Sequence, residues 1–352
     1  MRLFGKKRST TFNVIASLGA TGISAAAVLA AGKIIRKASR SSLDLHGKLA
    51  LITGGSRGLG LALARELGTQ GCRLALCARD AAELEEACRR LMQDGIEAKP
   101  FVCDISHESE IQPLISRVLA ESGEIDILVN NAGHITVGPL DTFEHADFER
   151  AMNVMFWAPL NLTFAVLPYM KARRSGHIVN ITSVGGRVSV PHLLPYSCAK
   201  FAFVGFSTGL SAELSPHGLH VLTVVPGLMR TGSYLNAEFK GSAKHEFAWF
   251  GLSSSLPGLT VSAHSAARCI RNALEERRHT CTISLPAKVL IASEALMPES
   301  TRAILAFVNR AVLPRSDDRH GPVTGKVVNP EFSTIFQGLT SLGKLAAREL
   351  NE

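Results

Sequence analysis

Short apolar runs alternate with amphipathic stretches along most of this chain. Seven such runs lie near residues 48–53, 73–78, 98–103, 126–130, 177–182, 219–225 and 280–285. Each run is long enough for a strand and too short for an ordinary helix, and several are apolar throughout, which is typical of strands covered on both faces. The stretches between them suit helices. This rhythm predicts an α/β fold with a doubly wound parallel sheet, in a single domain with terminal extensions.

The first run ends in glycines. Lys48 to Thr53 leads into Gly54-Gly55-Ser56-Arg57-Gly58-Leu59-Gly60, and an amphipathic segment from Leu61 to Leu67 follows. A strand, a glycine turn and a helix start present outward-facing backbone N–H groups, and the helix dipole there favours an anion. The pattern predicts a Rossmann-type diphosphate site. A glycine loop that serves only as a turn is the alternative.

Candidate acid–base chemistry lies further along the chain. Tyr196 and Lys200 are four residues apart and so share one face of a helix. A phenol titrates near ~10 in isolation, and a neighbouring ammonium lowers that pKa and favours proton exchange near neutral pH. The hydroxyl of Ser183 can hydrogen-bond a substrate oxygen. The pair alone would equally fit a tyrosine above a solvated lysine, so its meaning depends on the other motifs.

These motifs occur in one order: the glycine turn, Asn130-Asn131-Ala132-Gly133, Asn153, Ser183, Tyr196 and Lys200. The set resembles the classical short-chain dehydrogenase/reductase family from about Leu45 to about Pro286. The resemblance implies reversible hydride transfer between a nicotinamide cofactor and a small-molecule carbonyl/alcohol pair. It implies that Ser183 holds the carbonyl oxygen and that Tyr196 protonates it. Lys200 would lower the Tyr196 pKa and bind the nicotinamide ribose, and Asn153 would complete a proton relay.

The same resemblance implies a set of cofactor-binding residues. Asp104 would contact the adenine ring, although it would equally cap a helix beginning at Ser106, and Thr231 would contact the nicotinamide carboxamide. The full implied set is Gly54, Ser56, Arg57, Gly58, Leu59, Gly60, Arg79, Asp104, Asn131, Ala132, Gly133, Tyr196, Lys200, Pro226, Gly227 and Thr231.

Basic residues favour NADP over NAD. An NAD site usually carries an acid at the end of the second strand, bonded to the ribose 2′-hydroxyl. Here Ala78 and Arg79 end that run, and Arg57 lies in the glycine turn. Two guanidinium groups suit a 2′-phosphate. Asp80 follows directly and weakens the pattern, so NAD remains the alternative, with Arg79 as a solvated residue opening the next helix.

The positive charge is concentrated at the amino-terminal end. Eight of the 38 lysines and arginines precede Asp44, which is the first acid, so the remaining 30 balance the 30 Asp and Glu. Residues 9–32 carry no charge and exceed the ~20 residues that a membrane-spanning helix needs. We expect membrane association through residues 9–32, and no nucleic-acid binding by the neutral body. A cleaved signal peptide, with Ala25-Ala26-Ala27 near its end, and a mitochondrial presequence are the alternatives.

Seven cysteines in no metal-binding or redox spacing suggest reduced thiols facing the cytoplasm. Cys198 lies between Tyr196 and Lys200 on another helix face, and we interpret it as a packing residue. The histidines show no metal spacing, so no metal is expected. We therefore place the catalytic domain on the cytoplasmic side of a membrane, and a homo-oligomer is expected.

The carboxyl-terminal third is less informative. Residues 232–259 hold six aromatic or large apolar side chains where the family has a mobile substrate lid, which would favour an apolar, lipid-like substrate, unless they pack on a core of their own. The predicted organisation is an arm (1–42), a Rossmann domain (43–286) and a helical extension (287–352) with a last helix over 332–350. An epimerase or dehydratase on the same fold, or a non-catalytic NADP-binding scaffold or sensor at a membrane, are the competing functions.

Overall fold

The computed structural model describes residues 42–316, 321–329 and 334–352. Residues 43–352 form one compact unit. The uncharged stretch over residues 9–32, with the membrane association expected of it, lies outside the described residues.

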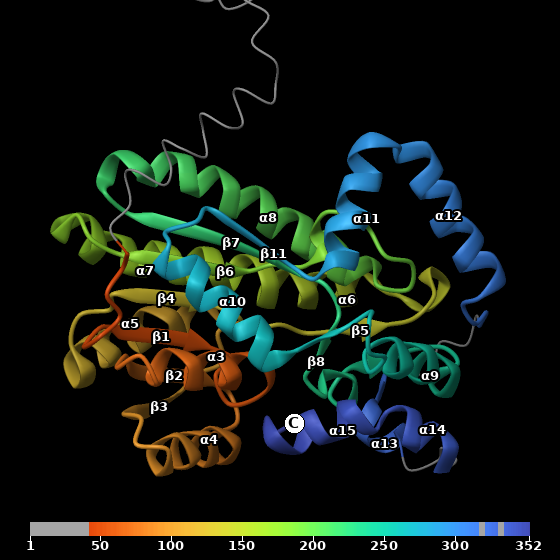
Figure 1. Ribbon diagram of the computed structural model, residues 1–352, viewed down its shortest axis with the longest axis horizontal. Helices are drawn as coiled ribbons and strands as arrows, with labels where there is room; N and C mark the ends of the chain where they lie inside the picture. Colours follow the sequence, from red (N-terminus) through yellow and green to blue (C-terminus); the bar gives the residue numbers. More distant parts are fainter. Residues whose placement is uncertain (1–41, 317–320, 330–333) are drawn as a thin grey trace, which may run out of the picture. The chain divides into compact units, whose positions relative to one another are not determined.

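A seven-stranded parallel sheet forms the centre of this unit (Figure 1). Its order is β11-β7-β6-β4-β1-β2-β3. The strands are β1 (Leu49–Thr53), β2 (Arg73–Ala78), β3 (Ala98–Val102), β4 (Ile127–Asn130), β6 (His177–Ile181), β7 (His220–Pro226) and β11 (Thr280–Ile283). All seven predicted strands are present, and the Rossmann-type parallel sheet is confirmed. The chain changes direction across the sheet between β1 and β4, and open α/β sheets bind ligands beyond the carboxyl ends of the strands at such a point.

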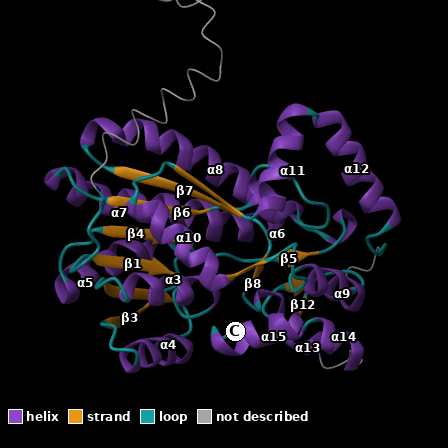
Figure 2. Ribbon diagram, viewed as in Figure 1, coloured by secondary structure: helices purple, strands orange, loops and turns teal. Residues whose placement is uncertain are grey.

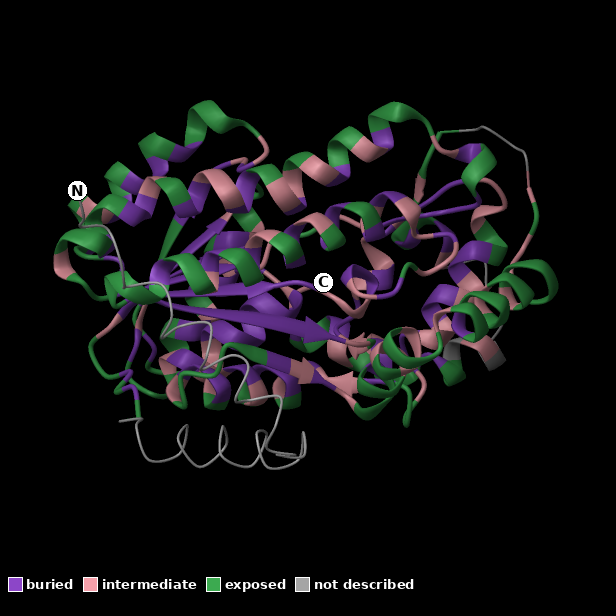
Figure 3. Ribbon diagram, turned by 90° about the horizontal axis from the view of Figure 1, so that it is seen from above, coloured by how far each residue is buried: buried purple, intermediate pink, exposed green. Residues whose placement is uncertain are grey.

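Helices cover both faces of the sheet (Figures 1 and 2). One layer contains α3 (Gly58–Gly68), α4 (Ala81–Gln93) and α10 (Ala263–Glu275), and the other α5 (Glu108–Ser122), α7 (Ala158–Arg173) and α8 (Leu194–Leu214). Each layer closes its own apolar core against the sheet, and Figure 3 shows the central strands as the buried part. Strands buried on both faces take apolar residues at most positions, which explains the near-continuous apolar runs in the sequence.

A long helical stretch extends over residues 145–173. It comprises α6 (His145–Met152), a π-helical turn η2 (Asn153–Trp157) and α7. Among the described residues, His145–Arg173 is the one stretch long and apolar enough to cross a membrane by length and composition. Leu162, Val166 and Met170 of α7 pack in the core beneath the sheet, so this stretch is accounted for as a core helix.

The segment after β7 forms a smaller layer beside the sheet. It contains β8 (Met229–Arg230), η5 (Ser233–Leu235), β9 (Glu238–Phe239), α9 (Ala243–Ser253) and β10 (Val261–Ser262). Tyr234, Phe239, Phe247 and Phe250 are all buried in a separate apolar cluster. These rings therefore pack on a core of their own, and they give no support to the prediction of an apolar substrate.

The carboxyl-terminal segment returns to this layer. After α11 (Leu285–Leu296) and α12 (Pro298–Ala311), β12 (Val323–Thr324) pairs with β9, which also pairs with β5 (Thr136–Val137), as Figure 2 shows in part. Then α13 (Gly325–Val328), α14 (Thr334–Leu339) and α15 (Ser341–Glu349) follow. The single last helix expected over 332–350 is thus two helices in the described part. Short 3-10 turns complete the fold: η1 (Leu140–Thr142), η3 (Val184–Gly186) and η4 (Ser215–His217).

Candidate active site

The glycine turn is fixed between the ends of β1 and β4. Thr53 Oγ1 accepts hydrogen bonds from the backbone N–H groups of Asn131 (3.0 Å) and Ala132 (3.2 Å). The Asn131 side-chain amide donates to the carbonyl oxygens of Thr53 (2.9 Å) and Gly54 (3.1 Å). A Cβ atom built on Gly60 would lie 2.0 Å from the carbonyl oxygen of Gly54. Only glycine fits there, because α3 packs so closely against the turn.

The first turn of α3 opens into a cleft. Gly58 begins the helix with φ +57°, and its N-cap Arg57 makes no side-chain cap. The backbone donors of a helix start have no partner within the helix and point toward the space in front of it. This is the arrangement that holds a phosphate or carboxylate.

Ser183 and Tyr196 lie at the same edge of the sheet. Ser183 follows β6 and accepts a hydrogen bond from the Gly185 N–H (3.0 Å). Tyr196 lies in the first turn of α8, with a ring carbon 3.1 Å from where a Gly185 Cβ would be. A side chain at Gly185 would push the phenol away, so the glycine allows the serine and the tyrosine to approach.

Lys200 lies one turn further along α8 and is buried. Its Nζ donates to the Ile181 carbonyl oxygen (2.9 Å) and lies 5.7 Å from the centroid of the Tyr196 ring. Burial lowers the pKa of Lys200 to about 7. The ammonium is therefore close to neutralisation at physiological pH, because the interior penalises its charged form.

The predicted lowering of the Tyr196 pKa is not seen. Burial raises the pKa of Tyr196 above the ordinary phenol value, and a hydrogen bond with Ser183 opposes this shift. The reason is that desolvation disfavours the charged phenolate, and this effect exceeds that of the Ser183 hydrogen bond.

Asn153 is placed by an irregular turn. It opens the π-helical turn between α6 and α7, and its exposed side chain lines the same cleft as Tyr196. An extra residue in a helical turn interrupts the regular ladder, and such turns are frequent at functional sites. Asn153 is thereby brought to the cleft although it lies within a long core helix.

The basic residues expected near a 2′-phosphate differ in their surroundings. Arg79 is exposed at the end of β2 and lines the cleft. Arg57 is engaged: its Nη1 donates to both carboxylate oxygens of Glu83 (2.9 and 3.1 Å). Asp80 is the N-cap of α4 and accepts from the Glu83 N–H (2.9 Å), so this acid has a helix-capping role.

Asp104 follows β3 in a local turn. Its carboxylate accepts from the N–H (3.0 Å) and the hydroxyl (2.7 Å) of Ser106. Although burial would raise its pKa, these hydrogen bonds and the charges of His107 and Arg79 hold the pKa of Asp104 below its usual value. The helix that follows begins at Glu108 with His107 as its N-cap, so the alternative of Asp104 as a helix cap is wrong.

One cleft of about 850 Å³ connects these residues. It is lined by every residue of the two predicted sets except Gly60, which lies behind the turn: Gly54, Ser56, Arg57, Gly58, Leu59, Arg79, Asp104, Asn131, Ala132, Gly133, Asn153, Ser183, Tyr196, Lys200, Pro226, Gly227 and Thr231. The ordered motifs of the sequence thus converge in space. Their individual roles are proposals that we take up below.

Several cleft residues were not predicted. His134 Nε2 lies 3.3 Å from a Glu238 oxygen, and Arg150 Nη1 lies 3.3 Å from the same oxygen. His134 directly follows the Asn131-Ala132-Gly133 motif, and this adjacency could have pointed to it. Glu238 and Arg150 had no such signal. Asn236 and Glu352 also line the cleft, and no sequence motif pointed to either residue.

Two other sequence interpretations concern cysteines and metals. Cys198 is exposed, so it is not a packing residue of this chain. Residues 42–316, 321–329 and 334–352 contain no group of three or more His, Cys, Asp or Glu side chains arranged to hold a metal ion.

Known proteins resemble this chain in both sequence and fold. The family model for short chain dehydrogenases matches residues 48–238. A fatty acyl-CoA reductase of Acinetobacter baylyi is 34% identical over 190 residues, which is 53% of this chain and 64% of that relative. The chain therefore spans less than two thirds of that relative's length.

Solved structures of short-chain dehydrogenases and oxidoreductases are also similar to this chain. A metagenomic short-chain oxidoreductase in complex with NADP is 39% identical and covers 53% of this chain and 84% of its own, with a TM-score of 0.50. A short-chain dehydrogenase from Streptomyces avermitilis is 29% identical and covers 75% of this chain and 96% of its own, with a TM-score of 0.63. With the family match extending over more than half of the sequence, this chain belongs to the short chain dehydrogenase family of oxidoreductases.

Proposed function

We propose that this protein is an NADP(H)-dependent oxidoreductase that interconverts a carbonyl and an alcohol on an apolar, lipid-like substrate. The observation that carries the proposal is the single cleft in which Ser183, Tyr196 and Lys200 meet the glycine turn. A hydroxyl, a phenol and an amine beside a diphosphate cradle are the groups that carbonyl reduction requires. When bound, the nicotinamide supplies the hydride in reduction and accepts it in oxidation.

The residues of the chain fit this cofactor. Gly54 and Gly58 leave the backbone of the turn free to approach a diphosphate, and Arg79 is exposed at the end of β2 where an NAD site would carry an acid. A guanidinium at this position suits a 2′-phosphate. The solved relative that binds NADP supports the same choice.

We assign the catalytic roles as the family resemblance implies them, and the shared cleft supports this assignment. Ser183 donates a hydrogen bond to the substrate oxygen, and Tyr196 gives that oxygen a proton as hydride reaches the carbon. Lys200, with its pKa lowered to about 7, can exchange a proton near neutral pH and so restore the phenol. Asn153 lines the same cleft and helps to hold the relay in place.

The proposal of a lipid-like substrate is supported by a related protein more than by the residues of the cleft. It is supported by the relative named a fatty acyl-CoA reductase. The buried aromatic residues of the smaller layer do not contribute, and His134, Arg150 and Glu238 give the cleft a charged rim. A substrate with a polar group next to its carbonyl and an apolar chain beyond it would satisfy both observations.

Cofactor choice can be tested with Arg79→Ala. A lost charge-assisted hydrogen bond to the 2′-phosphate costs ~1.5–3 kcal/mol, so NADPH affinity should fall about tenfold or more. NADH affinity should not change, because NADH lacks that phosphate. The matched control is Arg89→Ala, an exposed arginine on α4 that pairs with Glu86 and does not line the cleft. Both affinities are measured by titration of cofactor fluorescence, and equal binding of NADPH and NADH by the wild-type protein would contradict the choice.

The same preparation can be offered long-chain aldehydes, acyl thioesters and ketones beside hydrophilic ketoses, with NADPH consumption followed by absorbance. Reduction of the apolar series supports the proposed substrate class, and reduction of ketoses alone contradicts it. Tight NADPH binding without turnover of any of these compounds would favour the non-catalytic scaffold.

A further inference from the structure

The last residues of the sequence reach the glycine turn from the opposite end of the chain. The carbonyl oxygen of Leu350 accepts a hydrogen bond from the Gly58 N–H (2.9 Å). The side-chain amide of Asn351 donates to the carbonyl oxygens of Ser56 and Glu83, both at 3.1 Å. A backbone donor at the start of α3, where an anion would be held, is thus already bonded within the chain.

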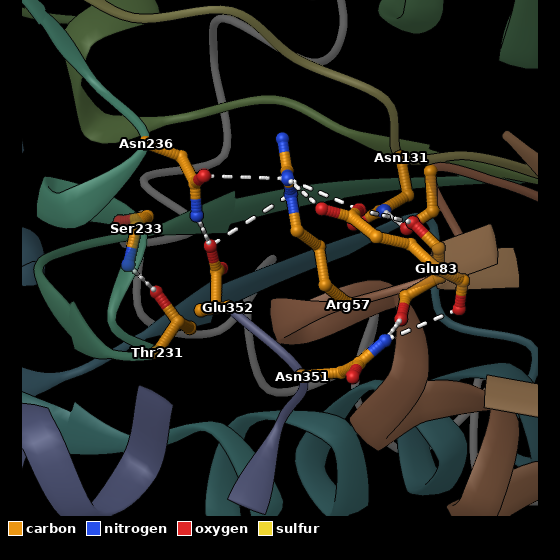
Figure 4. Close-up of polar contacts among 10 residues, drawn as sticks. Arg57, Glu83, Asn131, Thr231, Ser233, Asn236, Asn351 and Glu352 are labelled. Atoms are coloured by element: carbon orange, nitrogen blue, oxygen red, sulfur yellow. Dashed lines mark hydrogen bonds and ion pairs between the residues drawn. The ribbon is translucent and has the colours of Figure 1, made fainter. Parts of the chain in front are cut away.

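Glu352 places a carboxylate in the same space. One of its oxygens lies 2.5 Å from where a Cβ of Gly58 would be, so it occupies the space that a side chain at this position would fill. The other oxygen accepts from the Asn236 amide and lies 3.8 Å from Arg57 Nε. Figure 4 shows this carboxylate between Asn236 and Arg57. Its side chain is only 5% exposed.

The elements that precede residues 350–352, which we call the tail, hold it near the glycine turn. Strand β12 pairs with β9, and the close fit of Gly232 against Ala347 positions α15 (a Gly232 Cβ would lie 2.4 Å from the Ala347 Cβ). Leu350 is buried in the core shared by α3 and α10, and the Glu352 N–H donates to the Ala347 carbonyl oxygen (2.9 Å). The tail is therefore anchored at Leu350, and Asn351 and Glu352 project from the anchor into the cleft.

From these contacts we propose that Glu352 is an internal occupant of the cofactor's diphosphate site, held there by Asn236 and Arg57, and that a dinucleotide binds only when it displaces Glu352. The inference rests on the proposed function, because it takes the glycine turn to be the diphosphate cradle. The Glu352 side chain lies beside Gly58 at the start of α3, and the Leu350 carbonyl takes the Gly58 N–H. A diphosphate held at this helix start would need the same space and the same donor, so the two exclude each other.

Displacement need not unfold the tail. The Leu350 side chain can stay in the core while its carbonyl group releases the Gly58 N–H and Asn351 and Glu352 leave the cleft, so only a short segment has to move. The apparent affinity for cofactor is reduced by the fraction of molecules in which Glu352 is out of the cradle. Anything that stabilises the tail closes the site, and any partner that draws the tail away opens it.

Glu352→Ala tests the inference, with Glu352→Gln as a second variant that keeps the size of the side chain. The matched control is Glu349→Ala, an exposed glutamate of α15 that pairs with His264 outside the cleft. Affinities for NADPH and NADH are measured separately by titration, and hydrogen exchange over residues 341–352 is followed with and without NADPH. Thermal unfolding without cofactor verifies that each variant is folded.

We expect Glu352→Ala to bind NADPH and NADH about tenfold more tightly or better, because the diphosphate is common to both. Glu352→Gln should change in the same direction, and Glu349→Ala should bind as the wild type does. In the wild type, NADPH should increase exchange at Glu352 and its neighbours. A gain confined to NADPH would mean that Glu352 acts only on Arg57, and it would overturn the inference.

Unchanged or weaker binding by Glu352→Ala, with the tail still protected when NADPH is bound, would also overturn the inference while leaving the proposed function intact. If neither the wild type nor any variant binds a dinucleotide, the proposed function fails and the displacement of Glu352 by cofactor fails with it.

Discussion

Single side chains in this cleft behave differently from their isolated forms because burial changes their protonation. Burial raises the pKa of Glu352 to about 7, against the opposing effects of Arg57, Asn236 and Lys326 and with a further increase from Glu83. Burial also lowers the pKa of Lys200 to about 7. An acid and a base from distant parts of the sequence therefore both titrate near neutral pH in one cleft, which is the pattern expected at functional sites.

The raised pKa of Glu352 predicts how cofactor binding depends on pH. A free glutamate titrates near ~4.3, so between about pH 4.3 and about pH 7 the docked tail holds a proton that the released tail does not. As the pH rises through this window the docked state loses stability, and NADP⁺ binding should tighten. Below the window both states are protonated, and above it both are ionised.

The tightening of NADP⁺ binding with rising pH should be absent from Glu352→Gln, because the side chain of glutamine does not titrate. Dissociation constants for NADP⁺ are measured for both proteins across the window. Parallel pH profiles for the two would show that Glu352 does not control binding.

The strands and helices position these side chains. Of these elements, the strands of the central sheet were predicted best from the sequence. A strand covered on both faces is mostly apolar, so β1, β4, β6 and β7 are evident as near-continuous apolar runs, although polar residues such as Asn130, Asn180 and Thr223 are buried in them. The glycine turn was equally readable, because Gly54, Gly58 and Gly60 each meet a backbone requirement that other residues fail.

The elements after the sheet were less predictable for a physical reason. Strands β9 and β12 are two residues long and pair across more than eighty residues, so no local pattern marks them. The aromatic residues of the 232–259 segment carry the same signal whether they line a substrate site or pack together, and the structure shows Phe239 and Phe247 fully buried. Glu352 belonged to no motif and lies far from the glycine turn in the sequence, so no local pattern pointed to it.

At the scale of the whole molecule, the charge is divided between a basic amino-terminal arm and a neutral body. All eight cations of the arm precede Leu43, where the compact unit begins. The Leu43 N–H donates to the Glu275 carbonyl oxygen (2.9 Å), and the side chains of Leu43 and Leu45 are buried. Leu43 and Leu45 therefore belong to the core of the compact unit.

This division predicts the behaviour of a chain that starts at Ser42. It should fold, keep its affinity for NADPH within about twofold, and lose membrane association, because the ~20 uncharged residues that could enter a bilayer are gone. Cell fractionation and cofactor titration of the two forms measure this. Recovery of the intact, uncleaved full-length protein in the soluble fraction would rule out the anchor, and amino-terminal sequencing distinguishes a cleaved signal or presequence.

The central claim is that Tyr196 is the proton donor of a carbonyl reductase, and Tyr196→Phe tests it most directly. The change removes one oxygen and keeps the ring that packs beside Ala199 and Met155. Tyr169→Phe makes the same change at an exposed position on α7 outside the cleft. Turnover and NADPH binding are measured in parallel on a compound that the wild-type protein reduces.

General acid catalysis contributes ~10²–10⁴-fold, so turnover by Tyr196→Phe should fall by at least that range while NADPH affinity stays nearly constant. Tyr169→Phe should retain the wild-type rate. Near-wild-type turnover by Tyr196→Phe would place the proton donor elsewhere and contradict the account.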